Sequence, residues 1–174
     1  MKLANNFGWI VAAVLVAALG CSSEAPNTVE APLQVDGSQY LLSSEPEGAR
    51  PVIEVRETAA SDDEVVVTGR IGGSAEPWVD GRAAFSIVDP SLQACSDIEG
   101  DACPTPWDYC CVTDKIPTSN ALIKIVDDQG QLVEQDAREL LNLKELQTVV
   151  VRGKAQRDEA GNLTVLASDV YVRE

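Results

Sequence analysis

Five segments of the chain have the composition of β-strands, and together they constrain the fold more than any other feature. Each segment is rich in Val, Ile or Leu and is bounded by turn-forming residues, as strands are. The segments are residues 64–71, 83–88, 121–126, 148–155 and 163–172. Gly69 and Gly153 lie inside the first and the fourth segment, where they predict a bulge or a sharp coil. The alternation of the fifth segment shifts near Ser168, which predicts a bulge there.

One amphipathic segment, residues 136–146 (DARELLNLKEL), lies between the third and fourth strands. It places Leu140 and Leu141 on one helical face and has an aspartate at its start. Five strands with one helix between the third and the fourth resemble an OB-fold, a five-stranded Greek-key barrel. The resemblance covers residues 64–173 and implies a mainly β domain over residues 45–174.

A second, shorter helix is expected before the barrel. Ser44-Glu-Pro-Glu47 has the form of a capping box with an early proline and predicts a helix within residues 45–60. Pro51 offers an alternative first turn for this helix. A strand over residues 52–55 is the alternative to a helix.

The N-terminus resembles that of bacterial lipoproteins. Residues 1–20 combine a basic start with a short apolar run, which is the pattern of a secretory signal. The run ends at Ala-Leu-Gly-Cys21, which is similar to a lipobox, and this resemblance implies acylation of Cys21. Residues 21–44 then form a flexible tether. The resemblance implies a cell-envelope location with anchoring to a membrane through the lipid, at the periplasmic side of the outer membrane if the source is Gram-negative.

Three further segments resemble those of uncharacterised secreted bacterial proteins. They are Gly-Arg-Ile-Gly-Gly (69–73), Phe-x-Ile-Val-Asp-Pro-Ser-Leu (85–92) and Cys-Pro-Thr-Pro-Trp-Asp-Tyr-Cys-Cys (103–111). This resemblance implies no particular activity.

Charge and residue types exclude several functions. The formal net charge of −15 repels phosphate backbones and argues against nucleic-acid binding. The sequence has no histidine, which excludes imidazole ligands and every His-dependent nucleophile. The paired carboxylates of Asp127 and Asp128 lie at a predicted turn, where Asp is expected for backbone reasons, and no serine has a base to activate it. We therefore expect neither catalysis nor a bound cofactor.

Four of the five cysteines gather in a loop over residues 95–111, with the spacing C-x7-C-x6-C-C. The cysteines are Cys95, Cys103, Cys110 and Cys111. Outside the cytoplasm an even number of cysteines usually pairs, which predicts two disulfides that each contribute about 2–4 kcal/mol. Bonding between the two vicinal cysteines would strain the ring, so Cys95 and Cys103 are each expected to reach one of them.

A metal site is the principal alternative in the cysteine loop, since four thiolates suffice for Zn²⁺, Cu⁺ or an iron–sulfur cluster. The spacing departs from the usual zinc pattern of C-x2–4-C pairs. Four acidic residues add hard oxygens near the soft sulfurs: Asp97, Glu99, Asp101 and Asp108. Redox cycling is a third option, although the usual C-x-x-C pair is absent.

An OB-like barrel commonly binds ligands across its second and third strands and the adjoining loops. The residues that map to this face, together with an aromatic of the cysteine loop, are Trp78, Arg82, Lys124, Trp107 and Arg157. The alternative to a ligand face is that Trp78 to Arg82 form a packed turn and that the cationic side chains are solvated. The sequence therefore predicts a non-catalytic envelope lipoprotein with a disulfide-stapled binding module for a protein, a glycan or a small ligand. The alternative is a metal-binding or redox lipoprotein that uses the cysteine loop.

Overall fold

A computed structural model describes residues 35–173, which form part of one compact unit that begins at Leu33. The predicted signal, the acylation at Cys21 and the first part of the tether lie outside the described residues. The elements, in chain order, are η1 (Gly37–Tyr40), β1 (Arg50–Pro51), α1 (Val52–Thr58), β2 (Glu64–Ile71), β3 (Ala84–Val88), η2 (Cys95–Asp97), η3 (Pro106–Asp108), η4 (Cys110–Val112), α2 (Ile116–Ser119), β4 (Asn120–Ile125), α3 (Ala137–Leu141), β5 (Thr148–Arg157) and β6 (Leu163–Val172).

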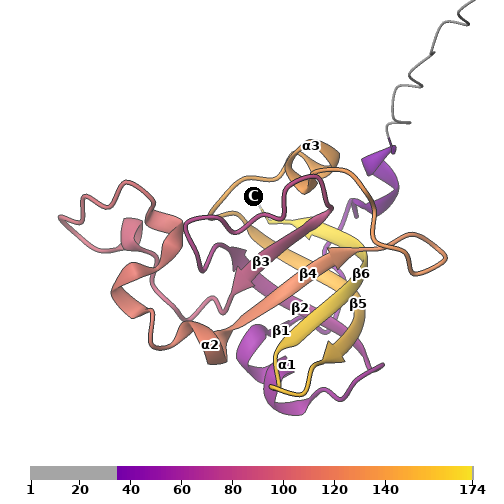
Figure 1. Ribbon diagram of the computed structural model, residues 1–174, viewed down its shortest axis with the longest axis horizontal. Helices are drawn as coiled ribbons and strands as arrows, with labels where there is room; N and C mark the ends of the chain where they lie inside the picture. Colours follow the sequence, from indigo (N-terminus) through magenta and orange to yellow (C-terminus); the bar gives the residue numbers. More distant parts are fainter. Residues whose placement is uncertain (1–34, 174) are drawn as a thin grey trace, which may run out of the picture. The chain divides into compact units, whose positions relative to one another are not determined.

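The strands form one closed barrel (Figure 1). Their order is β1-β2-β3-β4-β6-β5, and an antiparallel pairing of β2 with β5 closes the ring. The β4–β6 pair is parallel, whereas the other four pairs of the ring are antiparallel. This mixed five-stranded barrel is consistent with the OB-like fold expected from the sequence. Because the ring is closed, its Val-rich strands leave few unpaired edges.

Two glycines and one bulge allow the strands to coil tightly. A Cβ atom on Gly153 would lie 2.1 Å from the carbonyl oxygen of Leu166, and one on Gly69 would lie 2.8 Å from that of Val88. Any side chain at these positions would push neighbouring strands apart. The β5–β6 register shifts between Arg152 and Gly153, opposite Ser168, so the last strand is irregular where the alternation changes phase.

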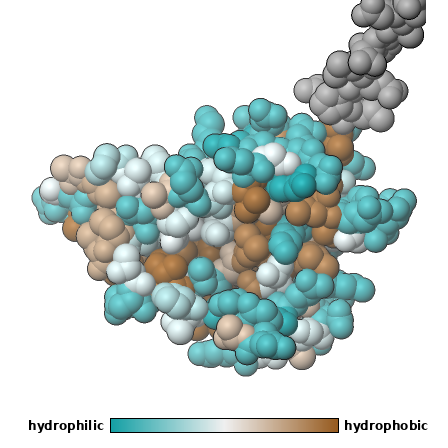
Figure 2. All heavy atoms as spheres, viewed as in Figure 1, coloured by the Kyte–Doolittle hydropathy of each residue, from teal (hydrophilic) through white to brown (hydrophobic). Residues whose placement is uncertain are grey.

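The barrel interior is filled by β-branched and aromatic side chains from all five strands. Five of them, one from each strand, are fully buried: Val67, Phe85, Ile123, Val151 and Val165. Phe85 and Ile87 face the same interior, as their alternation predicts. Figure 2 shows a predominantly hydrophilic surface on the face it presents, with apolar patches near the middle.

Two short helices lie at opposite ends of the barrel in Figure 1. The first, α1, buries Val52 and Val55, and it begins only at Val52, so Ser44–Glu47 does not start a helix. Its N-cap is Pro51, which supplies no side-chain acceptor.

The second helix, α3, begins after Asp136, whose carboxylate accepts a hydrogen bond from the backbone of Arg138 at 2.9 Å. It ends at Leu141, earlier than predicted, because Asn142 adopts a left-handed conformation with φ of 52°.

The predicted tether is shorter than residues 21–44. From Val35 onward the chain packs on the barrel, where Tyr40 is buried and the backbone of Leu42 donates to Val170 at 2.9 Å. Gly37 allows this segment to lie against the end of α3, since a Cβ atom at residue 37 would overlap the carbonyl of Leu140. The large apolar side chain of Tyr40 explains why this polar segment is held. Within residues 35–173, no helix has the length and apolar character needed to cross a membrane.

Candidate functional site: the cysteine loop

The cysteine loop lies on one side of the barrel, within the long connection between β3 and β4 (Figure 1). The connection is closed at its base, where the backbone N–H of Asp89 donates to the carbonyl of Ser119 at 2.8 Å. The carboxylate of Asp89 is buried and accepts hydrogen bonds from the backbone of Ile53 at 2.8 Å and of Ser91 at 3.0 Å. One side chain therefore joins the base of this connection to the first turn of α1.

The Gly72-Gly73 pair anchors the loop to the end of β2. The backbone N–H of Gly73 donates to the carbonyl of Trp107 at 2.8 Å, and the Trp107 indole donates to the carbonyl of Ala75 at 3.0 Å. A Cβ atom on Gly72 would lie 2.5 Å from the same Trp107 oxygen, so only glycine permits this approach. The indole of Trp107 is thereby committed to the loop's attachment.

An ion pair also connects the barrel to the loop. Arg70, at the end of β2, donates to the carboxylate of Asp97 at 2.5 Å. The hydrogen bond from Arg70, helped by one from the backbone of Ala94, lowers the pKa of Asp97 despite partial burial. No local signal in the sequence indicated this pair, so the role of Arg70 in positioning the loop comes from the structure.

The buried side chain of Tyr109 orients the two vicinal cysteines that follow it. Its side chain is fully buried among Val88, Leu92 and Ala94, and its backbone is left-handed with φ of 58°. Burial raises the pKa of Tyr109 to about 12, and its hydroxyl has no hydrogen-bond partner among the described residues. With the tyrosine turned inward, the next two residues, Cys110 and Cys111, are exposed.

The sulfurs of the loop converge on Cys110. Its Sγ lies 3.4 Å from that of Cys95, 3.9 Å from that of Cys103 and 3.9 Å from that of Cys111. Cys95 is buried, Cys103 is half-buried and the vicinal pair is exposed. The hydrogen bond with Cys95, together with desolvation and the other two sulfurs, raises the pKa of the Cys110 thiol. Cys110 thus favours its protonated form unless a cation compensates the charge of its thiolate.

A carboxylate completes this arrangement. Oδ1 of Asp108 lies 3.7 Å from Sγ of Cys95 and 3.9 Å from Sγ of Cys103. The backbone of Cys110 and the hydroxyl of Thr105 donate to the same carboxylate at 2.8 and 2.9 Å. Burial acts to raise the pKa of Asp108, but these hydrogen bonds outweigh it and lower the pKa. We call the set of Cys95, Cys103, Asp108 and Cys110 the inner cluster; its four ligand atoms all lie within 4.8 Å of one another.

The predicted disulfides are not formed in this structure. The closest Sγ pair among the four described cysteines, Cys95 and Cys110, is 3.4 Å apart, whereas a disulfide bond measures about 2.05 Å. The sequence did predict that these four cysteines act together, and the fold brings all of them into one cluster. It could not indicate that Asp108 and Asp101 contact the sulfurs whereas Asp97 turns toward Arg70.

The five residues predicted for a ligand face do not gather on one surface. Trp78 is buried, packs against Phe85 with ring centroids 5.7 Å apart and the rings tilted by 49°, and donates from its indole to Glu145 at 2.6 Å. Arg82 pairs with Glu134 at 2.9 Å near the end of the barrel that carries α3. Trp107 lies in the cysteine loop, while Lys124 is half-buried on β4.

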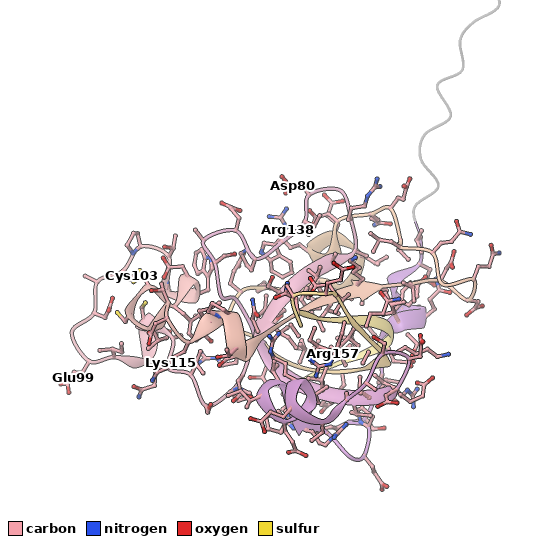
Figure 3. The ribbon with its side chains drawn as sticks, turned by 60° about the horizontal axis from the view of Figure 1, so that its bottom comes forward. Asp80, Glu99, Cys103, Lys115, Arg138 and Arg157 are labelled. Atoms are coloured by element: carbon pink, nitrogen blue, oxygen red, sulfur yellow. The ribbon has the colours of Figure 1, made fainter. Side chains whose placement is uncertain are left out.

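Arg157 lies at the opposite end of the barrel, beside α1, where it has a structural role. Its guanidinium donates to the carbonyls of Ala59, at 2.8 Å, and Arg56, which are the last carbonyls of α1. Figure 3 shows Arg157 close to α1 and well apart from Cys103 and from the Asp80–Arg138 pair. The contacts of Trp78 and Arg157 are those of packed residues, and they supply no open aromatic or cationic surface.

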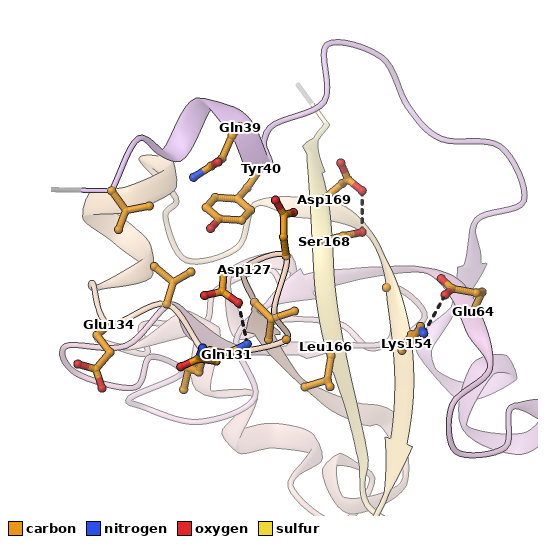
Figure 4. A pocket seen from close by; sticks show the side chains of 17 residues that line it. Gln39, Tyr40, Glu64, Asp127, Gln131, Glu134, Lys154, Leu166, Ser168 and Asp169 are labelled. Carbon is orange, nitrogen blue, oxygen red and sulfur yellow. Dashed lines mark hydrogen bonds and ion pairs between the residues drawn. The ribbon is translucent and has the colours of Figure 1, made fainter. Parts of the chain in front are cut away.

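A cleft of about 960 Å³ lies elsewhere, between η1, the turn after β4 and the strands β5 and β6 (Figure 4). Its polar side chains are largely engaged with one another: Glu64 pairs with Lys154 at 3.8 Å, and Asp169 accepts from Ser168 at 2.7 Å. Asp127 accepts two backbone hydrogen bonds within its own turn. The cysteine loop is therefore the better candidate for a functional site.

No known protein-family model and no curated protein matches the chain.

Proposed function

We propose that this protein is a lipid-anchored, non-catalytic protein of the bacterial cell envelope that binds a thiophilic metal ion in its cysteine loop. The envelope address is supported by the signal-like residues 1–20 and the lipobox-like sequence that ends at Cys21. The metal site is supported by the inner cluster. The observation that carries the proposal is that several sulfurs and one carboxylate oxygen surround a common point.

The distances suit tetrahedral coordination. Zinc–sulfur bonds of about 2.3 Å place the sulfurs at adjacent corners of a tetrahedron about 3.8 Å apart. The Sγ atoms of Cys103 and Cys95 lie 3.9 and 3.4 Å from that of Cys110. The carboxylate oxygen of Asp108 lies 3.7 Å from the nearest sulfur, that of Cys95. Small adjustments of the side chains would give a closed four-ligand site.

The ligand types favour Zn²⁺ over hard cations. Three thiolates select soft or borderline metals, and one carboxylate is a common partner for zinc but a poor one for Cu⁺. The hydrogen bonds from the backbone of Cys110 and the hydroxyl of Thr105 hold the Asp108 carboxylate in place, as outer-shell partners do in known metal sites. The net charge of −15 raises the local concentration of cations around the loop.

Two disulfides are the competing function of the same sulfurs. An oxidising envelope favours them, and both predicted pairings start from a short contact of Cys110. Cys95 with Cys110 uses the 3.4 Å contact and leaves Cys103 for Cys111, whereas Cys103 with Cys110 uses the 3.9 Å contact and leaves Cys95 for Cys111. The metal proposal is preferred because Cys110 has three sulfur neighbours at similar distances, and a disulfide can use only one of them. If the two disulfides form instead, they would cross-link the loop, and the loop would have a structural role only.

Metal content and thiol count, measured on the same sample, decide between the two functions. The full chain is expressed with its signal, purified from the envelope without chelator, and analysed for zinc and for alkylation with and without reductant. We expect at least one equivalent of zinc and four thiols that alkylate after chelation alone. Thiols that become available only after reduction, with no bound metal, would contradict the proposal and establish the disulfides.

Two substitutions provide matched controls for this measurement. Asp108→Asn should weaken zinc binding because the amide is a poorer ligand than a carboxylate. Asp114→Asn removes the same charge from an exposed position in the same connection and should leave binding unchanged. Equal zinc affinities in the two variants would remove Asp108 from the site.

The anchor is tested separately. Cys21→Ser should abolish the mass added by acylation and release the protein from the membrane fraction. Cys110→Ser, which changes a cysteine outside the lipobox, should retain the acyl chains. A Cys21→Ser variant that remains acylated and membrane-bound would disprove the lipid anchor.

A further inference from the structure

A second set of ligand atoms adjoins the inner cluster. Oδ2 of Asp101 lies 3.7 Å from Sγ of Cys111, and both atoms are within 4.8 Å of Sγ of Cys95. The other oxygen of Asp101 accepts a hydrogen bond from the backbone of Cys103 at 2.6 Å, which fixes the carboxylate. We call Cys95, Asp101 and Cys111 the outer cluster. Neither Asp101 nor Cys111 belongs to the inner cluster.

Cys95 is the residue that the two clusters share. It is also the most buried of the four cysteines, with 1% of its surface exposed. A thiolate sulfur has enough lone pairs to bind two cations at once, and Sγ of Cys95 lies within 4.8 Å of the ligand atoms of both clusters. One sulfur is thereby positioned to bridge two metal ions.

We propose that the cysteine loop holds two thiophilic divalent ions, one in the inner cluster and one in the outer cluster, with the Cys95 thiolate bridging them. This inference rests on the proposed function, because it assumes that the inner cluster binds zinc.

Charge balance supports the second ion. When metal ions displace the protons of all four thiols, the two clusters hold four thiolates and two carboxylates, a negative charge that two divalent ions offset better than one. Arg70, the basic side chain that contacts the loop from β2, is committed to Asp97. A second cation offsets the repulsion between the remaining thiolate of Cys111 and the carboxylate of Asp101.

The two ions would differ in their exchange with solvent. The inner site has four protein ligands and is closed, as structural zinc sites are. The outer site has three protein ligands, and two of them, Asp101 and Cys111, are exposed. Three-ligand sites keep a position for water or another ligand. The outer ion is therefore the one that exchanges, and through it the loop can accept or deliver a metal ion.

Metal stoichiometry of the full chain tests this inference. The reduced, metal-free protein is titrated with Zn²⁺ and with Cd²⁺, whose thiolate absorption reports sulfur ligation, and bound ions are counted by native mass spectrometry. We expect two equivalents, the second lost first on mild chelation. Cys111→Ser and Asp101→Asn should each reduce the count to one, and Asp114→Asn should leave it at two.

The outcomes separate the two proposals. One equivalent in the unaltered protein, with no change in Cys111→Ser, would overturn the bridged pair and leave the single zinc site standing. No bound metal under reducing conditions would overturn both proposals. Both outer-cluster substitutions change exposed side chains, and far-ultraviolet circular dichroism confirms that the variants fold. The count in the unaltered protein decides the question even if a variant fails.

Discussion

Replacing Asp89 with alanine should lower the free energy of unfolding by about 2–4 kcal/mol, because two backbone N–H groups lose their acceptor. The carboxylate accepts from Ile53 in the first turn of α1 and from Ser91 after β3. Loss of a helix cap costs about 1 kcal/mol, and an unsatisfied buried N–H costs about 1–3 kcal/mol. Asp89 is only 3% exposed, so water cannot readily replace it in the folded protein.

Urea unfolding of the reduced, metal-free protein measures this effect without interference from the cysteine loop. The midpoint should fall while the dependence on urea stays the same, since the surface exposed on unfolding is unchanged. Asp89→Asn should lie between Asp89→Ala and the unaltered protein, because its amide oxygen can accept only one of the two hydrogen bonds well. Asp114→Ala removes an exposed acid from the same connection and serves as the control. A loss for Asp89→Ala no larger than that of the control would refute the capping argument.

Three further predictions concern stability. Gly153→Ala should destabilise the protein by about 1–3 kcal/mol or more, because the new methyl group would lie 2.1 Å from a backbone oxygen; an unchanged thermal midpoint would contradict this. Thr68→Val should raise the free energy of unfolding by about 1 kcal/mol, because the buried Thr68 hydroxyl has no partner among the described residues; a lower urea midpoint would show that it has one. Arg70→Gln should destabilise the protein at neutral pH and progressively less in acid. The ion pair lowers the pKa of Asp97, so its stabilisation is present above the unfolded-state pKa of about 4 and is lost as the pH falls through the folded-state pKa. A difference between the urea curves of the two proteins that does not change with pH would contradict this ion pair.

Much of the fold follows from local patterns. Runs of Val, Ile and Leu bounded by turn-forming residues predicted the five strands, because these side chains fill the interior of the barrel. The helix α1 shows where this approach is incomplete: the capping box at Ser44–Glu47 starts no helix, whereas the alternative start at Pro51 is the one that forms. The first turn is capped by Asp89, which is remote in sequence, and no local pattern can reveal such an acceptor.

The tether shows the same dependence on remote contacts. Residues 22–44 are rich in Ser, Pro and Glu, so composition indicated a flexible segment. Burial of Tyr40 and pairing of Leu42 with Val170 hold residues 35–42 on the barrel instead. A single large apolar side chain was the available signal, and its partners come from β6 and α3.

The sequence by itself determined that four cysteines share one loop, that this loop interrupts a small β-barrel, and that no histidine is available to act beside them. Only the tertiary structure decided which groups meet. Gly72 and Gly73 draw Trp107 against the barrel, Tyr109 turns inward, and the sulfurs of Cys95 and Cys103 arrive beside Cys110 with the carboxylate of Asp108. Residue spacing states how far apart ligands are along the chain, whereas coordination depends on directions in space, which the packing of a buried tyrosine and two close backbone approaches determine here.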